Sequence, residues 1–103
     1  MDYPWSDDDF EWDQTKSDWC AQFRGIDFRF AARAFSDPDR EVVRDTRDRY
    51  DEARFLLYGR IDGRLHIVVF TRRAEVIRII SVRKANQREI RFHANRANED
   101  RRL

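Results

Sequence analysis

The order of hydrophobic and polar positions predicts a short strand and then a helix near the start of the chain. Phe10 and Trp12 flank a polar residue, an alternation that is typical of a strand. Asp13 follows with a carboxylate that can cap a helix starting at Gln14, and Gly25 supplies the left-handed residue that ends it. Three apolar residues share a face of this helix, namely Trp19, Cys20 and Phe23, and of these Trp19 is expected in the core.

A second helical stripe follows directly. The carboxylate of Asp27 can cap it. Ile26 before the cap and Ala31 four residues after it have the spacing of a hydrophobic staple, which also indicates a helix start here. The segment from Ser36 to Asp39 ends this helix, since Pro38 cannot continue it and the aspartates favour a turn. The stripe consists of Phe28, Ala31, Ala32 and Phe35.

After this turn the spacing changes to that of strands. Residues 42–43 begin one strand, a charged loop covers residues 47–52, and residues 54–61 form the next strand. The last strand is expected at residues 76–82. We therefore expect a compact α+β domain in which two N-terminal helices pack on an antiparallel sheet and a C-terminal helix follows.

A hairpin turn fixes how the central strands pair. Asp62-Gly63 is a two-residue turn, so Phe55 should face Phe70 and Leu57 should face Val68. One side of this hairpin then carries Phe55, Leu57, His66, Val68 and Phe70, and the other carries Leu56, Tyr58, Leu65, Ile67 and Val69. Because both faces are apolar, helices should cover one and something else at least part of the other, with a protein partner as one candidate.

The C-terminal segment is predicted to be a basic helix. Asn86 and Glu89 have the spacing of a capping box at its start. Its apolar stripe is weak and its surface is rich in arginine: the stripe is Ile90, Ala94 and Ala97, and the surface carries Arg88, Arg91, Arg96, Arg101 and Arg102. We expect the end of this helix to fray or project unless a partner holds it.

Length and composition limit the possible architectures. The chain of 103 residues fits one domain with one core, which we place at residues 10–103 after an acidic extension at residues 1–9. The single Cys20 excludes an internal disulfide, and the acidic start lacks the features of a signal peptide. No run of about 18 apolar residues predicts a membrane helix. We therefore expect a cytoplasmic protein without membrane contact.

The net charge of +1 conceals a strong asymmetry. Residues 1–53 hold 8 Lys and Arg against 15 Asp and Glu, whereas residues 54–103 hold 13 against 5. A basic half made almost entirely of arginine favours binding of a polyanion, because the guanidinium group grips phosphate oxygens in pairs. Two simpler explanations remain open: the halves can neutralise each other in the folded domain, and arginine can reflect a GC-rich genome.

The basic half contains the residue types that RNA cleavage requires. RNA supplies its own nucleophile, the 2′-hydroxyl, so an enzyme needs only alignment, cations and groups that move protons. No Cys or His spacing predicts a metal site, so we expect catalysis without metal or cofactor. The candidates are Arg54, Arg78 and Arg83 on strands, Lys84 at a strand end, Glu52 before a strand, and His93 on the last helix.

These cations should converge around one scissile phosphate. Alternation in a regular strand places Arg78 and Arg83 on opposite faces, so they share a site only if the strand bends near Arg83.

A series of short motifs resembles the BrnT family. They are Phe10-Glu-Trp-Asp13 with Lys16, Gly25-Ile-Asp-Phe28, Phe35-Ser-Asp-Pro38, Glu52-Ala-Arg54, Gly59-Arg60, Arg78-Ile-Ile-Ser-Val-Arg-Lys-Ala85 and Glu89. Each motif alone is weak, but the ordered series over residues 10–93 is specific. The resemblance implies a toxin of a type II toxin-antitoxin module, with a RelE-like fold and a metal-independent endoribonuclease activity on mRNA that arrests translation.

The resemblance also implies partners. A BrnA-type antitoxin would neutralise the toxin, dimerise and bind operator DNA, in a heterotetramer that contains two toxins. Operator DNA would therefore be contacted only through the antitoxin.

Matching residue by residue, the resemblance favours a catalytic group and an RNA-binding group. The catalytic candidates are Glu52, Arg54, Arg78, Arg83 and His93, and the RNA-binding candidates are Lys84, Arg88 and Arg91. The chain departs from the family pattern at three positions: Cys20 stands where Asn is usual, Arg24 where His is usual, and His93 where Tyr is frequent.

Simpler roles exist for each candidate. Arg54 and Arg78 can form structural ion pairs with Glu52 or other acids, and His93 can be a packed histidine. Glu89 already caps a helix. The competing function is a protein-binding module without catalysis that acts through its antitoxin-type partner. Direct DNA binding is disfavoured, because no helix-turn-helix pattern precedes the basic helix.

Overall fold

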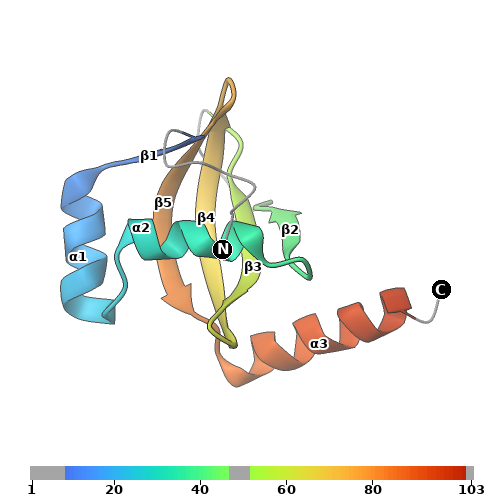
Figure 1. The fold of residues 1–103 in the computed structure, drawn as a ribbon. Helices are drawn as coiled ribbons and strands as arrows, with labels where there is room; N and C mark the ends of the chain where they lie inside the picture. The colour runs from blue at the N-terminus through green and yellow to red at the C-terminus, as the bar shows by residue number, and fades with distance from the viewer. Residues whose placement is uncertain (1–8, 47–51, 102–103) are drawn as a thin grey trace.

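A mixed sheet of five strands organises the chain (Figure 1). The computed structural model describes residues 9–46 and 52–101. The strands are β1 (Phe10–Trp12), β2 (Glu41–Arg44), β3 (Phe55–Ile61), β4 (Arg64–Arg73) and β5 (Val76–Lys84), and they lie in the order β1-β5-β4-β3-β2.

The sheet differs from the expected antiparallel one at an edge. Strands β2 to β5 pair antiparallel, but β1 runs parallel to β5 with Phe10 opposite Ile77. The expected antiparallel sheet is therefore found in β2 to β5, and the parallel pairing of the short first strand with it was not predicted. Local pattern could not reveal this pairing, because the first and last strands meet only through the tertiary fold.

The helices begin and end where the sequence predicts. α1 (Gln14–Arg24) is capped by Asp13, whose side chain accepts hydrogen bonds from two backbone N–H groups, and Gly25 ends it with φ at 73°. The side chain of Asp27 caps α2 (Phe28–Ala31), which continues as the 3₁₀ helix η2 (Ala32–Ser36). The last helix is α3 (Gln87–Arg101).

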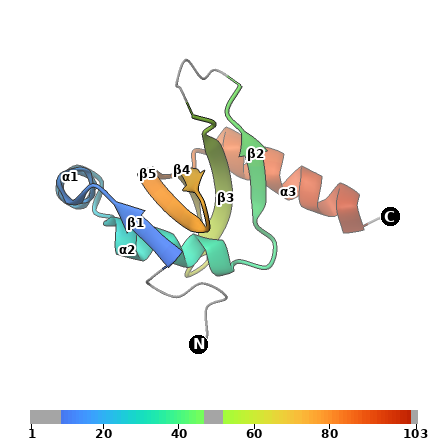
Figure 2. The same cartoon turned by 90° about the horizontal axis from the view of Figure 1, so that it is seen from above.

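The helices cover the sheet unequally. Figure 2 shows α2 and η2 on one side of the sheet and α3 on the other, while α1 lies beside the edge formed by β1 and β5. The expected packing of two N-terminal helices on the sheet is therefore correct only for the second one. The reason lies in α1 itself, where Ser17 and Cys20 are buried but Trp19 and Phe23 are 49% and 63% exposed. Trp19 is not a core residue, contrary to the sequence-based expectation.

The central hairpin has the predicted register. Phe55 pairs with Phe70 and Leu57 with Val68, and the turn residues Asp62 and Gly63 have φ of 51° and 82°. The main core lies between this side of the sheet and α2 with η2. The second face carries a smaller cluster of Leu65, Ile67 and Ala85, packed by Leu56, Tyr58 and Ile90. Ile90 belongs to α3, so this helix covers part of the second face.

A β-bulge interrupts β5. Val69 lies opposite Ser81 and Phe70 lies opposite Ile79, so Ile80 is an extra residue without a partner in the register. The bulge reverses the alternation of the strand after this point.

The segment at residues 47–51 and most of the acidic extension, residues 1–8, lie outside the described residues. No helix in the described part of the chain is long and apolar enough to cross a membrane.

Gly59 allows η2 to approach β3 closely. A Cβ atom at this position would lie 2.5 Å from the carbonyl oxygen of Ala34 and 2.9 Å from Cδ2 of Leu57. We expect Gly59→Ala to lower the free energy of unfolding by about 2 kcal/mol, because the packed backbone of η2 must move. Urea unfolding measures this loss, with Val42→Ala on the exposed edge strand as the control. A change within about 0.5 kcal/mol would contradict the close approach.

Candidate functional site

Glu52 is held by an arginine at the end of the β4–β5 hairpin. Arg73 donates to both carboxylate oxygens of Glu52, at 3.0 and 3.3 Å. The hydroxyl of Thr71 donates to the carbonyl oxygen of Ala53 at 2.7 Å, which fixes the chain next to Glu52 against β4. The hydrogen bond from Arg73 holds the pKa of Glu52 below its usual 4.5. Glu52 is therefore an anion at neutral pH.

Arg54 and Arg78 complete this group of charges. Both guanidinium groups are near enough to lower the pKa of Glu52 further, after the larger effect of Arg73. Arg78 lies opposite Glu11 across the β1–β5 pairing, and their side-chain atoms Nη1 and Oε1 are 3.6 Å apart. We call these five residues the hairpin-end cluster: Glu11, Glu52, Arg54, Arg73 and Arg78.

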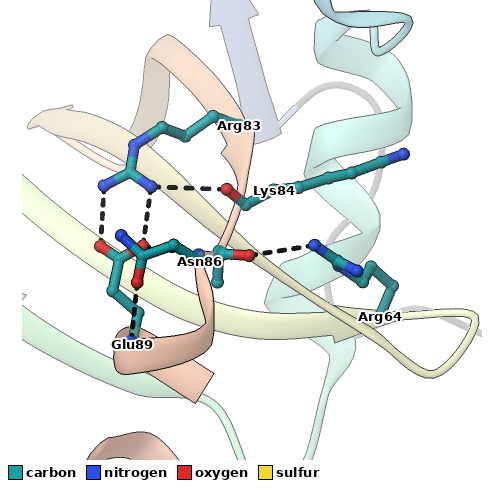
Figure 3. Close-up of polar contacts among 6 residues, drawn as sticks. Arg64, Arg83, Lys84, Asn86 and Glu89 are labelled. Atoms are coloured by element: carbon teal, nitrogen blue, oxygen red, sulfur yellow. Dashed lines mark hydrogen bonds and ion pairs between the residues drawn. The ribbon is translucent and has the colours of Figure 1, made fainter. Parts of the chain in front are cut away.

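A second charged group lies where β5 meets α3 (Figure 3). Arg83 donates from both terminal nitrogens to the two carboxylate oxygens of Glu89, each at 2.8 Å. Glu89 also accepts from the backbone N–H of Asn86, and its own N–H donates to the Asn86 side chain, which confirms the predicted capping box. The hydrogen bonds with Arg83 lower the pKa of Glu89.

Two further cations lie near this ion pair. Arg64 donates to the carbonyl oxygen of Ala85 at 3.0 Å, and Figure 3 shows the Lys84 side chain directed away from Arg83. The side chains of Arg83 and Lys84 thus point to opposite faces of β5, as those of neighbouring strand residues do. We call Arg64, Arg83, Lys84 and Glu89 the helix-end cluster.

The bulge places Arg78 and Arg83 on the same face of the sheet. Arg78 pairs with Thr71 and Arg83 with Ile67, and these two β4 residues share a face because they are four positions apart. Four strand residues span about 13 Å of backbone, and the side chains have different partners, since Arg78 lies near Glu11 and Glu52 whereas Arg83 is bonded to Glu89. The expected convergence of all the cations on one phosphate is therefore not found.

His93 lies at the α3 end of the sheet face, on the same side as the Arg83–Glu89 pair and away from Glu52, Arg54 and Arg78. Its ring is 2% exposed and stacks on Tyr58, with ring centroids 6.2 Å apart. Neither ring nitrogen has a hydrogen-bond partner in the part of the chain that the structure describes. Arg88 and Arg91, by contrast, are exposed on α3. Within the described ranges, no group of His, Cys, Asp and Glu is arranged to hold a metal ion.

Sequence reasoning missed Arg73, Thr71 and Glu11. The signal for the first two was present in the hairpin register: Phe55 opposite Phe70 continues to place residues 52–54 beside residues 71–73. No local signal could identify Glu11, because its position next to Arg78 depends on the parallel β1–β5 pairing.

The burial of His93 predicts how a substitution at this position changes the free energy of unfolding. A buried imidazole without hydrogen bonds is unfavourable, so we expect His93→Phe to raise the free energy of unfolding by about 1 kcal/mol. His66→Phe is the matched control and should be destabilising, because His66 Nδ1 lies 2.8 Å from the carbonyl oxygen of Arg64. Both are measured by urea unfolding at pH 7. A destabilised His93→Phe would mean that the imidazole has a polar role.

Comparison with known proteins identifies the family. The family model described as "Ribonuclease toxin, BrnT, of type II toxin-antitoxin system" matches residues 12–89. The match covers the hairpin-end cluster except Glu11 and covers the whole helix-end cluster, and it ends before His93. A search of curated proteins gave no match. The chain therefore belongs to the BrnT family of ribonuclease toxins of type II toxin-antitoxin systems.

Proposed function

We propose that this protein is a metal-independent endoribonuclease with a RelE-like fold, which cleaves mRNA in the cytoplasm and so inhibits translation. The observation that carries the proposal is the hairpin-end cluster, in which two carboxylates and three guanidinium groups share one end of a sheet face. Family membership supports ribonuclease activity.

The proposed reaction needs only groups that this cluster contains. Glu52 accepts the proton of a 2′-hydroxyl, whose oxygen then attacks the adjacent phosphorus. The bond from phosphorus to the 5′ oxygen breaks, and this oxygen takes a proton from solvent. Arg54 and Arg78 stabilise the negative charge that develops on the phosphorane oxygens. We assign no proton transfer to His93, because its ring is buried at the other end of the face.

The helix-end cluster has a supporting role in this proposal. The distance of about 13 Å between the two clusters along β4 exceeds what one phosphate can bridge. Arg83, Lys84, Arg88 and Arg91 would therefore bind RNA phosphates away from the bond that is cut. Glu89 holds the guanidinium of Arg83 in place, since both of its terminal nitrogens are bonded to the same carboxylate.

Membership in a toxin-antitoxin family implies a protein partner. We propose that a BrnA-type antitoxin neutralises the toxin in a heterotetramer with two toxins, and that this antitoxin alone contacts operator DNA. A second candidate function is a protein-binding module without catalysis. It is favoured by one observation, which is that Arg73, Arg78 and Arg83 each have an acidic partner within the chain.

Substitution of two arginines separates these functions. We expect Arg78→Ala to slow RNA cleavage by about 100-fold and Arg83→Ala by about tenfold, because Arg78, unlike Arg83, lies near the proposed base. Both variants should relieve the growth arrest caused by toxin expression while keeping the fold and antitoxin binding. Arg29→Ala, on an exposed position of α2, is the charge-matched control.

Two results would contradict the proposed function or its site. If Arg78→Ala remains fully toxic, the hairpin-end cluster is not the catalytic site. If the wild-type protein neither arrests growth nor cuts RNA but binds the antitoxin tightly, the binding-module function is correct.

The pH dependence of cleavage tests the role of Glu52. A general base is active when deprotonated, and the pKa of Glu52 is lowered, so the rate should fall only below its usual value of 4.5. Removal of Arg73 takes away the largest cause of the lowered pKa. Arg73→Ala should therefore move this acidic limb to higher pH, as measured in cleavage rates between pH 3 and 7, about the range in which carboxylates titrate. An unchanged limb would exclude Glu52 as the base.

A further inference from the structure

Two aromatic side chains on α1 are left exposed although they have helical spacing. Trp19 is 49% exposed and Phe23 is 63% exposed. Their ring centroids are 5.1 Å apart with an angle of 40° between the ring planes. The core is formed without them, because Cys20 and Ser17 are the α1 residues that become buried. An exposed pair of large rings on a small domain indicates a contact surface.

Arg24 holds this pair against the sheet. Its guanidinium carbon lies 5.0 Å from the centroid of the Trp19 ring, and its Nη1 donates to the carbonyl oxygen of Val82 at 2.9 Å. The carbonyl is accessible because β1 pairs with β5 only from Ile77 to Ile79. Arg24 thus links the end of α1 to the residue of β5 that directly precedes Arg83.

Arg24 is the cation in contact with this pair, and it bonds β5 two residues before Lys84. Lys84 and Arg64 belong to the same end of the sheet, and Lys84 is directed away from the Arg83–Glu89 pair (Figure 3). The acidic neighbour Asp18 accepts a hydrogen bond from the side chain of Gln14 at 2.8 Å. Exposed rings beside a cation are a combination with which proteins bind single-stranded nucleic acid, since a base stacks on a ring and a phosphate contacts the cation.

We propose that Trp19 and Phe23, braced by Arg24, form a platform on which a base of single-stranded RNA stacks. The inference rests on the proposed ribonuclease function and extends it, because it places RNA on the helix side of β5 as well as on the face that carries Arg83. RNA is favoured over a protein occupant by charge complementarity with Arg24, which contacts Trp19, and with Lys84, which lies two residues beyond the Val82 that Arg24 bonds. The platform would hold a nucleotide that is not itself cut, so Trp19 contributes to binding and not to the chemical step.

Binding of a cleavage-resistant RNA tests the platform. The probe is a fluorescently labelled 2′-O-methyl oligonucleotide, which lacks the nucleophile, and its affinity is measured by fluorescence anisotropy. We expect Trp19→Ala to weaken binding about tenfold and Trp19→Phe to retain most of the affinity, because a base stacks on either ring. Val42→Ala, on the opposite edge of the sheet, should bind like the wild type. Circular dichroism verifies that each variant is folded.

Salt dependence and an abasic probe separate stacking from charge. Loss of a stacked ring should leave unchanged the slope of the logarithm of the binding constant against the logarithm of the salt concentration. Lys84→Ala should reduce this slope by about 1, because one phosphate contact is lost. With an oligonucleotide that lacks its bases, Trp19→Ala and the wild type should bind equally, because no ring can stack.

Three outcomes would overturn the platform. If Trp19→Ala binds the probe like the wild type while the wild type cuts RNA, the platform is wrong and the proposed function stands. If Trp19→Ala instead loses binding to the antitoxin alone, the surface is a protein interface. If the wild type neither binds the probe nor cleaves RNA, the platform and the proposed function fail together.

Discussion

The extra residue in β5 decides how the charges of this protein are distributed. Ile80 has no partner in the β4–β5 register, so every later residue of β5 faces the side opposite to the one that regular alternation predicts. Val82 consequently joins the main core, and Arg83 faces the same side as Arg78. Without the bulge, a basic residue would point into the core under α2. Packing and charge therefore require the same irregularity, which makes the bulge a structural requirement of this sheet.

The second face of the sheet is where this arrangement has functional consequences. α3 packs on one end of it through Ile90, and the hairpin-end cluster occupies the other end. A single strand of RNA that crosses this face would meet cations at both ends. α3 covers the small cluster around Leu65 and Ile67, and no other helix among residues 9–46 and 52–101 covers the remainder of this face (Figures 1 and 2).

Local signals in the sequence predicted the elements, and long-range contacts decided the rest. The caps at Asp13 and Asp27 and the Asp62-Gly63 hairpin depend on neighbouring residues, so their chemistry can be read directly. The parallel pairing of β1, the exposure of Trp19 and the bulge depend on how distant elements pack. The same holds for the candidate site. The residue types could be predicted from the sequence, but their separation into two clusters could not, because it depends on long-range contacts.

Ion pairing of the candidate arginines is compatible with catalysis. Exposed ion pairs contribute only about 0–1 kcal/mol, so a phosphate can compete with a carboxylate for a guanidinium group that is partly open to solvent. Arg78 is a favourable case, since its Nη1 lies 3.6 Å from Oε1 of Glu11 and both side chains are partly exposed. Arg83 differs, because two bonds of 2.8 Å and the capping role of Glu89 hold its pair together. Under the proposed function, this difference assigns Arg78 to the charge that develops during the reaction and Arg83 to fixed contacts with RNA.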